Sequence, residues 1–235
     1  MYGYIYGYYW DWTYFLLLIG AVLSIIASAR VQSSFNKYST IRSMSGLTGA
    51  EAAQRILNNA GIYDVSIERV NGHLSDHYDP RSKVLRLSDA TYGNSSVAAI
   101  GVAAHECGHA IQHNVGYGPL TLRSTLVPAA NIASRLGIPI IILGVILSYN
   151  YVLIQIGIWV FALAVFVQLV TLPVEFNASN RAVALLEQYG ILGSSEIKPC
   201  KKVLSAAAMT YVAAAASSIL SLIRLILLFG RRRDD

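Results

Sequence analysis

Charge-free apolar runs occupy much of the chain and predict helices that cross a membrane. Residues 12–29 contain no charged side chain and have the roughly 17–25 residue length that one crossing requires. Residues 136–174 are also free of charge, but this run is too long for one crossing. Because Ser148–Tyr151 interrupts it with polar residues, we expect a tight hairpin of two spans, over 130–148 and 152–172.

The first apolar run is expected to be a membrane anchor. Tyrosine and tryptophan are frequent among residues 2–10, as in the aromatic belts at membrane interfaces. A cleaved signal peptide is the weaker interpretation, because no Lys or Arg precedes Arg30 and a signal peptide begins with a basic region.

Residues 30–125 form a polar stretch between the first apolar run and the hairpin. Thr48 and Glu51 have the spacing of a capping box ahead of a helix over 52–60, and Gly61 is a natural stop. A second helix is expected from Val97 onward, with Asn94 or Ser95 as its N-terminal cap.

Short strands are expected between these two helices. Residues 65–70 alternate apolar and polar, and Asn71-Gly72 is a hairpin turn signal before a second strand over 73–78. Residues 84–87 predict a third strand, which we interpret as an edge strand. The polar stretch is therefore expected to fold as a helix, a small antiparallel sheet and a helix.

Composition supports a membrane protein and sets its orientation. The chain is 54% hydrophobic and only 13% charged, whereas soluble domains carry about 25% charged residues. The net charge of +5 is spread along the flanks of the apolar runs, so the lipid bilayer rather than nucleic acid is the expected partner. Because Arg30, Lys37 and Arg42 follow the first span and no basic residue precedes it, the polar stretch is expected in the cytoplasm.

A fourth apolar run, Val203–Phe229, conflicts with this orientation. It contains Arg224 and is followed by three arginines at 231–233, which would lie outside the cell if the run crossed the membrane. We therefore expect this helix to be partly buried against the others or re-entrant, so that three to four helices enter the membrane.

The residues with the clearest chemistry are His105-Glu106-Cys107-Gly108-His109. On a helix, side chains four residues apart lie on one face, so both histidines can bind one ion while Glu106 reaches a water beside it. Cys107 lies on the other side of this helix and is expected to be a buried packing residue. Gly108 is expected to allow a neighbouring helix to approach closely.

A catalytic zinc site usually has a third protein ligand. His113, His77, His73 or a carboxylate elsewhere could supply it, although His113 lies about 12 Å from His105 along a straight helix. Glu175 is the better candidate, because it lies at the end of a long charge-free run. A carboxylate so close to a hydrophobic segment is energetically costly and therefore indicates a functional residue. An interfacial Glu175 paired with Arg181 is a comparable interpretation from the pattern alone.

Several motifs together resemble the neutral zinc metallopeptidases of bacterial membranes, the YugP-type family. The resemblance extends over nearly the whole chain, and its motifs are His105–Gln112, Asp76–Arg81 with Leu85–Ser88, Leu172–Ala182 and Ala207–Val212. This family is similar to the gluzincins, in which a glutamate on a later helix is the third ligand. The resemblance implies that His105, His109 and Glu175 bind Zn2+. Many gluzincins have Asp four residues after that glutamate, where this chain has Ser179, which supplies no charge.

The fold expected from all of this is an α-helical integral membrane protein with a small α+β, zincin-like catalytic part. Its parts are an anchor over 1–29, a catalytic part over 30–125, a transmembrane hairpin over 126–174, and the third-ligand helix with the apolar C-terminal helix over 175–235.

The expected function is that of a zinc endopeptidase of the cell membrane, acting on membrane-associated or misfolded proteins. Glu106 would be the general base. His77, Arg181 and Tyr211 are candidates to stabilise the oxyanion, and the strand over 84–87 is a candidate to pair with substrate backbone. The alternatives are a non-catalytic protein with a structural metal site, and a protein that transports metal.

Overall fold

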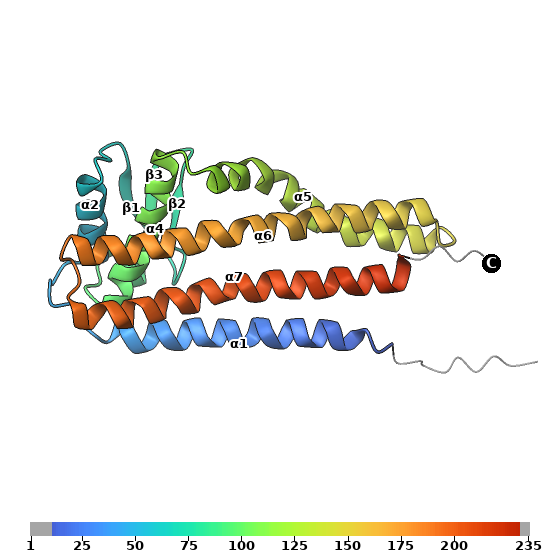
Figure 1. Ribbon diagram of the computed structural model, residues 1–235, viewed down its shortest axis with the longest axis horizontal. Helices are drawn as coiled ribbons and strands as arrows, with labels where there is room; N and C mark the ends of the chain where they lie inside the picture. The colour runs from blue at the N-terminus through green and yellow to red at the C-terminus, as the bar shows by residue number, and fades with distance from the viewer. Residues whose placement is uncertain (1–10, 231–235) are drawn as a thin grey trace, which may run out of the picture.

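The computed structural model describes residues 11–230, which form a mostly helical molecule with one small sheet (Figure 1). In chain order its elements are α1 (Tyr14–Ser39), α2 (Gly49–Asn59), β1 (Ser66–Val70), β2 (His77–Asp79), β3 (Val84–Ser88), α3 (Asp89–Tyr92), α4 (Val97–Asn114), α5 (Gly118–Ile146), α6 (Tyr151–Gln188) and α7 (Ser194–Phe229). The tyrosine-rich start and the arginines at 231–233 lie outside the described residues.

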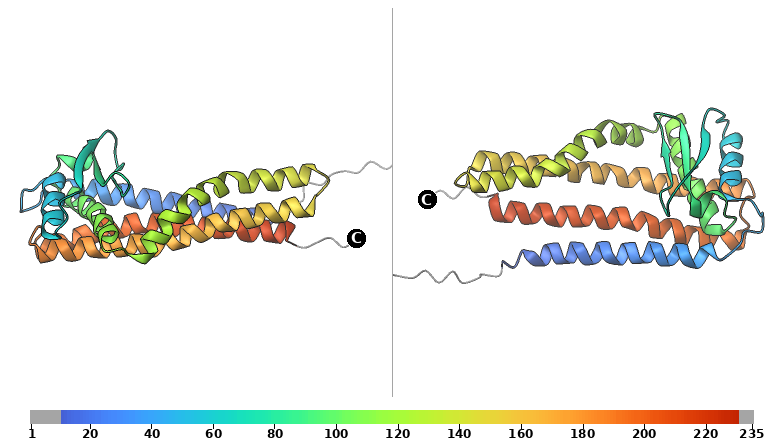
Figure 2. Two further views of the ribbon diagram at one scale, coloured as in Figure 1. Left: turned by 90° about the horizontal axis from the view of Figure 1, so that it is seen from above. Right: turned by 180° about the vertical axis from the view of Figure 1, so that it is seen from behind.

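Four of these helices, α1, α5, α6 and α7, are long and apolar enough to cross a membrane. They run side by side away from the sheet, and α2, α4 and the sheet gather at one end of them (Figures 1 and 2). The predicted hairpin is confirmed as α5 and α6, joined by a turn in which Ser148 and Tyr149 have positive φ angles of 57° and 58°. The helices extend beyond the predicted spans toward the sheet, because a change from apolar to polar residues ends a span and not a helix. Pro128 and Pro139 lie inside α5, which bends along its length (Figure 2).

Of the two alternatives expected for the C-terminal helix, the re-entrant one is wrong, whereas partial burial is observed, since Leu204, Ala208 and Ala215 are buried. α7 is one continuous helix that lies along α1 (Figure 1), and its apolar window is no more buried than that of α1, at 11% in each. Arg224 is accommodated at the far end of α1, 3.6 Å from Asp11 and 4.5 Å from the ring of Tyr14. The arginines at 231–233, on which the expectation of a re-entrant helix rested, lie outside the described residues.

The sheet is mixed, whereas an antiparallel sheet was expected. The strand order is β1-β3-β2, with β1 parallel and β2 antiparallel to β3. The hairpin is therefore between β2 and β3 and not at Asn71-Gly72. In its turn, Asp79 accepts hydrogen bonds from the Ser82 hydroxyl and the Arg81 backbone, which lower the pKa of Asp79 to about 2.

The prediction that residues 84–87 form an edge strand is also wrong. β3 is the central strand, and Leu85 and Leu87 are fully buried. β3 has the most buried side chains of the three strands. At an edge, the backbone hydrogen-bonding groups on one side of this buried strand would be unpaired. Among the described strands, β1 and β2 are the edges.

α4 is the buried helix on which the remaining polar elements pack. Its cap is Ser96, whose hydroxyl accepts a hydrogen bond from the Ala99 amide, so the expected caps Asn94 and Ser95 are one or two residues early. The predicted capping box of Thr48 and Glu51 on α2 is confirmed. Cys107 is fully buried, with its thiol 3.6 Å from the Ala53 carbonyl oxygen, as expected for a packing residue.

Candidate active site

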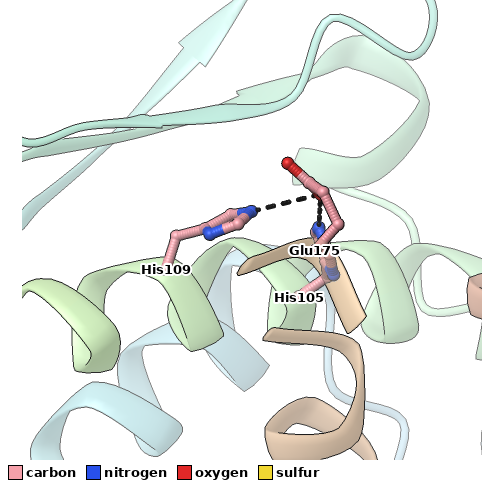
Figure 3. Close-up of side chains that lie close together, drawn as sticks. All are labelled: His105, His109 and Glu175. Carbon is pink, nitrogen blue, oxygen red and sulfur yellow. Dashed lines mark hydrogen bonds and ion pairs between the residues drawn. The ribbon is translucent and has the colours of Figure 1, made fainter. Parts of the chain in front are cut away.

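Two helices far apart in sequence bring three potential metal ligands together. His105 and His109 are on α4, and Glu175 is on α6, with α5 between them in the chain. The Glu175 Oε2 atom lies 3.2 Å from His105 Nε2 and 3.6 Å from His109 Nε2 (Figure 3). One ligand atom from each residue lies within 4.8 Å of the others, which is close enough for all three to bind one ion.

The other histidines lie outside this cluster. The His113 Nδ1 atom lies 2.9 Å from the Tyr78 hydroxyl, and the His73 ring packs edge-on against Phe35. The His77 Nδ1 atom lies 2.9 Å from the Ser75 carbonyl oxygen. Of the ligands considered from the sequence, only Glu175 therefore joins His105 and His109.

The two imidazole rings are held by side chains behind them. The Ser179 hydroxyl lies 3.1 Å from His105 Nδ1, and the Gln112 Oε1 atom lies 3.0 Å from His109 Nδ1. These contacts direct both Nε2 atoms toward Glu175. Ser179, which stands where many gluzincins have an aspartate, thus contacts a histidine although it has no charge. Partners of this kind fix ring orientation in metal sites.

Gln112 is itself fixed by α6. It is fully buried, and its amide donates hydrogen bonds to the Val174 carbonyl oxygen at 2.8 Å and to Asn177 Oδ1 at 3.0 Å. The segment of α6 that contains Glu175 is therefore bonded to the side chain that orients His109.

Arg123, on α5, contacts the candidate ligand and was not predicted from the sequence. Its Nη1 atom lies 3.1 Å from Glu175 Oε1. The pairing of Glu175 with Arg181, considered from the sequence, is not observed, since Arg181 donates to Asn177 Oδ1 at 2.8 Å. The sequence holds no local signal for Arg123, because the chain between Arg123 and Glu175 includes most of a transmembrane hairpin.

A groove lies over the three residues, between β2 and the first turns of α5. Its volume is about 310 Å3. Glu106, His77, Arg123 and Tyr211 line it, and Arg181 is not among its lining residues. Tyr211 lines the groove together with Glu175. Of the three residues named from the sequence as oxyanion candidates, His77 and Tyr211 line the groove together with Arg123, whereas Arg181 does not.

The electrostatics of the groove favour a cation at the histidines. Burial lowers the pKa of His109, but its contact with Glu175 and the negative charges of Glu106 and Glu175 outweigh burial and raise this pKa above its ordinary value. Two imidazoles and one carboxylate are a common donor set for catalytic zinc. The residues present therefore fit Zn2+, and a metal would displace the proton that these charges favour on His109.

Comparison with known proteins agrees with this donor set. A family model described as "Putative neutral zinc metallopeptidase" matches residues 13–230. The curated protein "Putative membrane protease YugP" of Bacillus subtilis (strain 168) is 48% identical over 221 residues, which cover 94% of this chain and 98% of that protein. No solved structure matches the chain. Since the family match includes all four long helices and the whole ligand cluster, the chain belongs to the neutral zinc metallopeptidase family that this model describes.

Proposed function

We propose that this protein is a membrane-embedded zinc endopeptidase whose catalytic part is zincin-like. The observation that supports this most directly is the convergence of His105, His109 and Glu175 at the base of a groove that Glu106 also lines. A helix with two ligands and an adjacent glutamate, completed by a carboxylate from another helix, is an arrangement that supports peptide hydrolysis by a metal-activated water.

The residues have distinct roles in this proposal. His105, His109 and Glu175 would hold Zn2+. When bound, this ion would act as a Lewis acid that activates water and polarises the peptide carbonyl. Glu106 accepts the proton of the attacking water and passes it to the amine nitrogen as the C–N bond breaks. Tyr211, His77 and Arg123 line the groove as donors to the developing oxyanion.

The groove also suggests how a substrate binds. β2 is an edge of the sheet, and its residues His77 and Tyr78 line the groove. An extended peptide can pair with such an edge through backbone hydrogen bonds, so β2 takes the role expected at first for residues 84–87. Residues of α5, α6 and α7, which are long and apolar enough to cross a membrane, line the groove beside the polar elements. Membrane-associated or misfolded proteins are therefore the proposed substrates.

The test compares the native protein with Glu106→Gln in detergent, measuring bound zinc and cleavage of an unfolded protein such as casein. We expect one zinc in each, and a fall in kcat/KM of about 10²–10⁴-fold in the variant, which is the usual contribution of a general base. Glu187→Gln, which removes an exposed carboxylate from α6, is the control and should cleave normally.

Other outcomes would argue for a different function. Zinc in both proteins with no cleavage by either would favour a non-catalytic metal site or metal transport. Absence of stoichiometric metal would contradict the ligand assignment itself.

A further inference from the structure

A second cavity adjoins the groove at the candidate ligands, and we name it the rear cavity. Its volume is about 230 Å3, and residues of α1, α4, α6 and α7 form its walls. It shares His105, Glu106, Glu175 and Tyr211 with the groove. The candidate site thus lies between two spaces, one bounded by β2 and α5 and the other by the membrane helices α1 and α7.

Six of the residues that line the rear cavity away from the ligands are apolar. One of them, Leu74, is held at a φ angle of 57°, a backbone conformation that bulky residues rarely adopt. It packs against the buried cluster of Phe35, Tyr38, Ala98 and Val203. The apolar wall residues are Val31, Leu74, Val102, Leu204, Ala207 and Ala208.

Three polar side chains of these walls already have partners within the protein. Asp76 accepts hydrogen bonds from the Ser88 amide at 2.8 Å and the Ser88 hydroxyl at 2.9 Å. The Ser179 hydroxyl bonds to His105, and the Thr210 hydroxyl donates to the Ala207 carbonyl oxygen at 2.6 Å. Because these three groups are already bonded, the six apolar residues of the walls favour an apolar occupant.

We propose that the rear cavity binds an aliphatic or aromatic side chain of the substrate, on the residue next to the scissile bond. The inference rests on the proposed function, because the walls shared with the groove place the occupant beside the reacting bond. Cavities of roughly 150 Å3 accept benzene, so the 230 Å3 of the rear cavity suffice for leucine or phenylalanine. The enzyme would then select cleavage sites by one apolar residue.

The first experiment maps the cleavage sites in casein by mass spectrometry for the native protein, Ala207→Leu and Ala206→Leu. Ala207 is half-buried and lines the rear cavity, so leucine there fills the space that the substrate side chain would occupy. Ala206, its neighbour on α7, lines a different groove beside Lys37 and Lys202, so the same added volume leaves the rear cavity unchanged.

We expect the native protein and Ala206→Leu to favour large apolar residues at one position beside the cut. Selection by apolar pockets is typically about 10–200-fold for a small change in side-chain size. In Ala207→Leu this preference should fall by about tenfold or more toward glycine and alanine, with cleavage at small residues retained. Val31→Ala enlarges the cavity from α1 and should shift the preference from leucine toward phenylalanine, so the proposal stays testable if Ala207→Leu does not fold.

Binding gives a second readout that does not depend on cleavage. In the Glu106→Gln background, fluorescent peptides that differ only by leucine or glycine at the selected position are titrated by anisotropy. The leucine peptide should bind at least about tenfold more tightly, and adding Ala207→Leu should remove the difference while Ala206→Leu keeps it.

Two failures are distinguishable. Cleavage without an apolar preference, or a preference that Ala207→Leu leaves intact, would overturn the rear-cavity proposal and leave the peptidase assignment standing. No cleavage of casein by the native protein would overturn the peptidase assignment, and the rear-cavity proposal with it.

Discussion

Glu175 uses its two carboxylate oxygens for different partners. Oε2 faces both histidines, whereas Oε1 lies 3.1 Å from Arg123. The side chain of Glu175 is only 2% exposed, and a buried carboxylate needs partners for both oxygens. Arg123 therefore both offsets the charge of Glu175 and leaves a single oxygen directed at the metal position.

Replacing Arg123 by glutamine should weaken zinc binding. The outer oxygen of Glu175 then loses its charged partner, and removal of such supporting groups costs about 10–100-fold in metal affinity. The measurement is competition for zinc with a chelator in detergent. The control is Arg81→Gln, which removes a guanidinium from the same groove but no partner of Glu175. Equal zinc affinity in native protein and Arg123→Gln would show that Glu175 is held without Arg123.

At the scale of elements, the site depends on how closely α4 approaches α6. A Cβ atom added to Gly108 would lie 2.6 Å from the Ala178 carbonyl oxygen and 3.1 Å from the Ala178 Cα atom. These are backbone atoms, so α6 would have to move. The expected close approach of a neighbouring helix at Gly108 is therefore confirmed, and the neighbour is the helix that contains Glu175.

Gly108→Ala should destabilise the protein and weaken zinc binding together. Helix propensity alone would make this change stabilising by roughly 1 kcal/mol, but overpacking at a tight contact costs about 1–3 kcal/mol. Thermal unfolding and zinc affinity are measured beside Gly118→Ala, at a helical glycine whose added Cβ meets no atom within 4 Å. If Gly108→Ala is as stable as the native protein and binds zinc equally well, the helix contact does not position Glu175.

At the scale of the whole molecule, the four long helices leave the polar elements at one end (Figure 1). The start of α1 and the end of α7 lie together at the other end, where Arg224 meets Asp11. Basic residues also gather at the end with the polar elements, since Lys198 and Lys201 in the first turns of α7 add to Lys37 at the end of α1. The positive-inside rule then predicts cytoplasmic polar elements, with both ends of the described chain outside.

This topology predicts which cysteines an impermeant label reaches on intact cells. Trp12→Cys and Gly230→Cys should be labelled, whereas Tyr63→Cys, at a position that is 79% exposed, should react only after permeabilisation. The native cysteines Cys107 and Cys200 are buried, and burial raises the pKa of the Cys107 thiol. We therefore expect little background labelling of these two residues. If only Tyr63→Cys is labelled on intact cells, the protein has the opposite orientation, with its polar elements outside the cell. Labelling of position 12 without position 230 would show that α7 does not cross.

Much of the molecule follows from local sequence pattern. Runs of apolar residues determined the long helices, because length and hydropathy act within one segment. The i, i+4 spacing determined that His105 and His109 share a face, and the Thr48 capping box began α2 where expected. The resemblance to a family supplied Glu175 as the third ligand, which the pattern alone left open.

Other features were decided by tertiary structure, because they depend on segments that meet only after folding. Asn71-Gly72 signals a local turn, but the buried side chains of Leu85 and Leu87 make β3 the central strand, and this overrode the hairpin. An arginine within an apolar run is costly in a membrane-spanning helix, yet Asp11 lies 3.6 Å from Arg224. Arg123 reaches Glu175 only because α5 and α6 fold back on each other, since a partner so distant along the chain leaves no trace in local sequence.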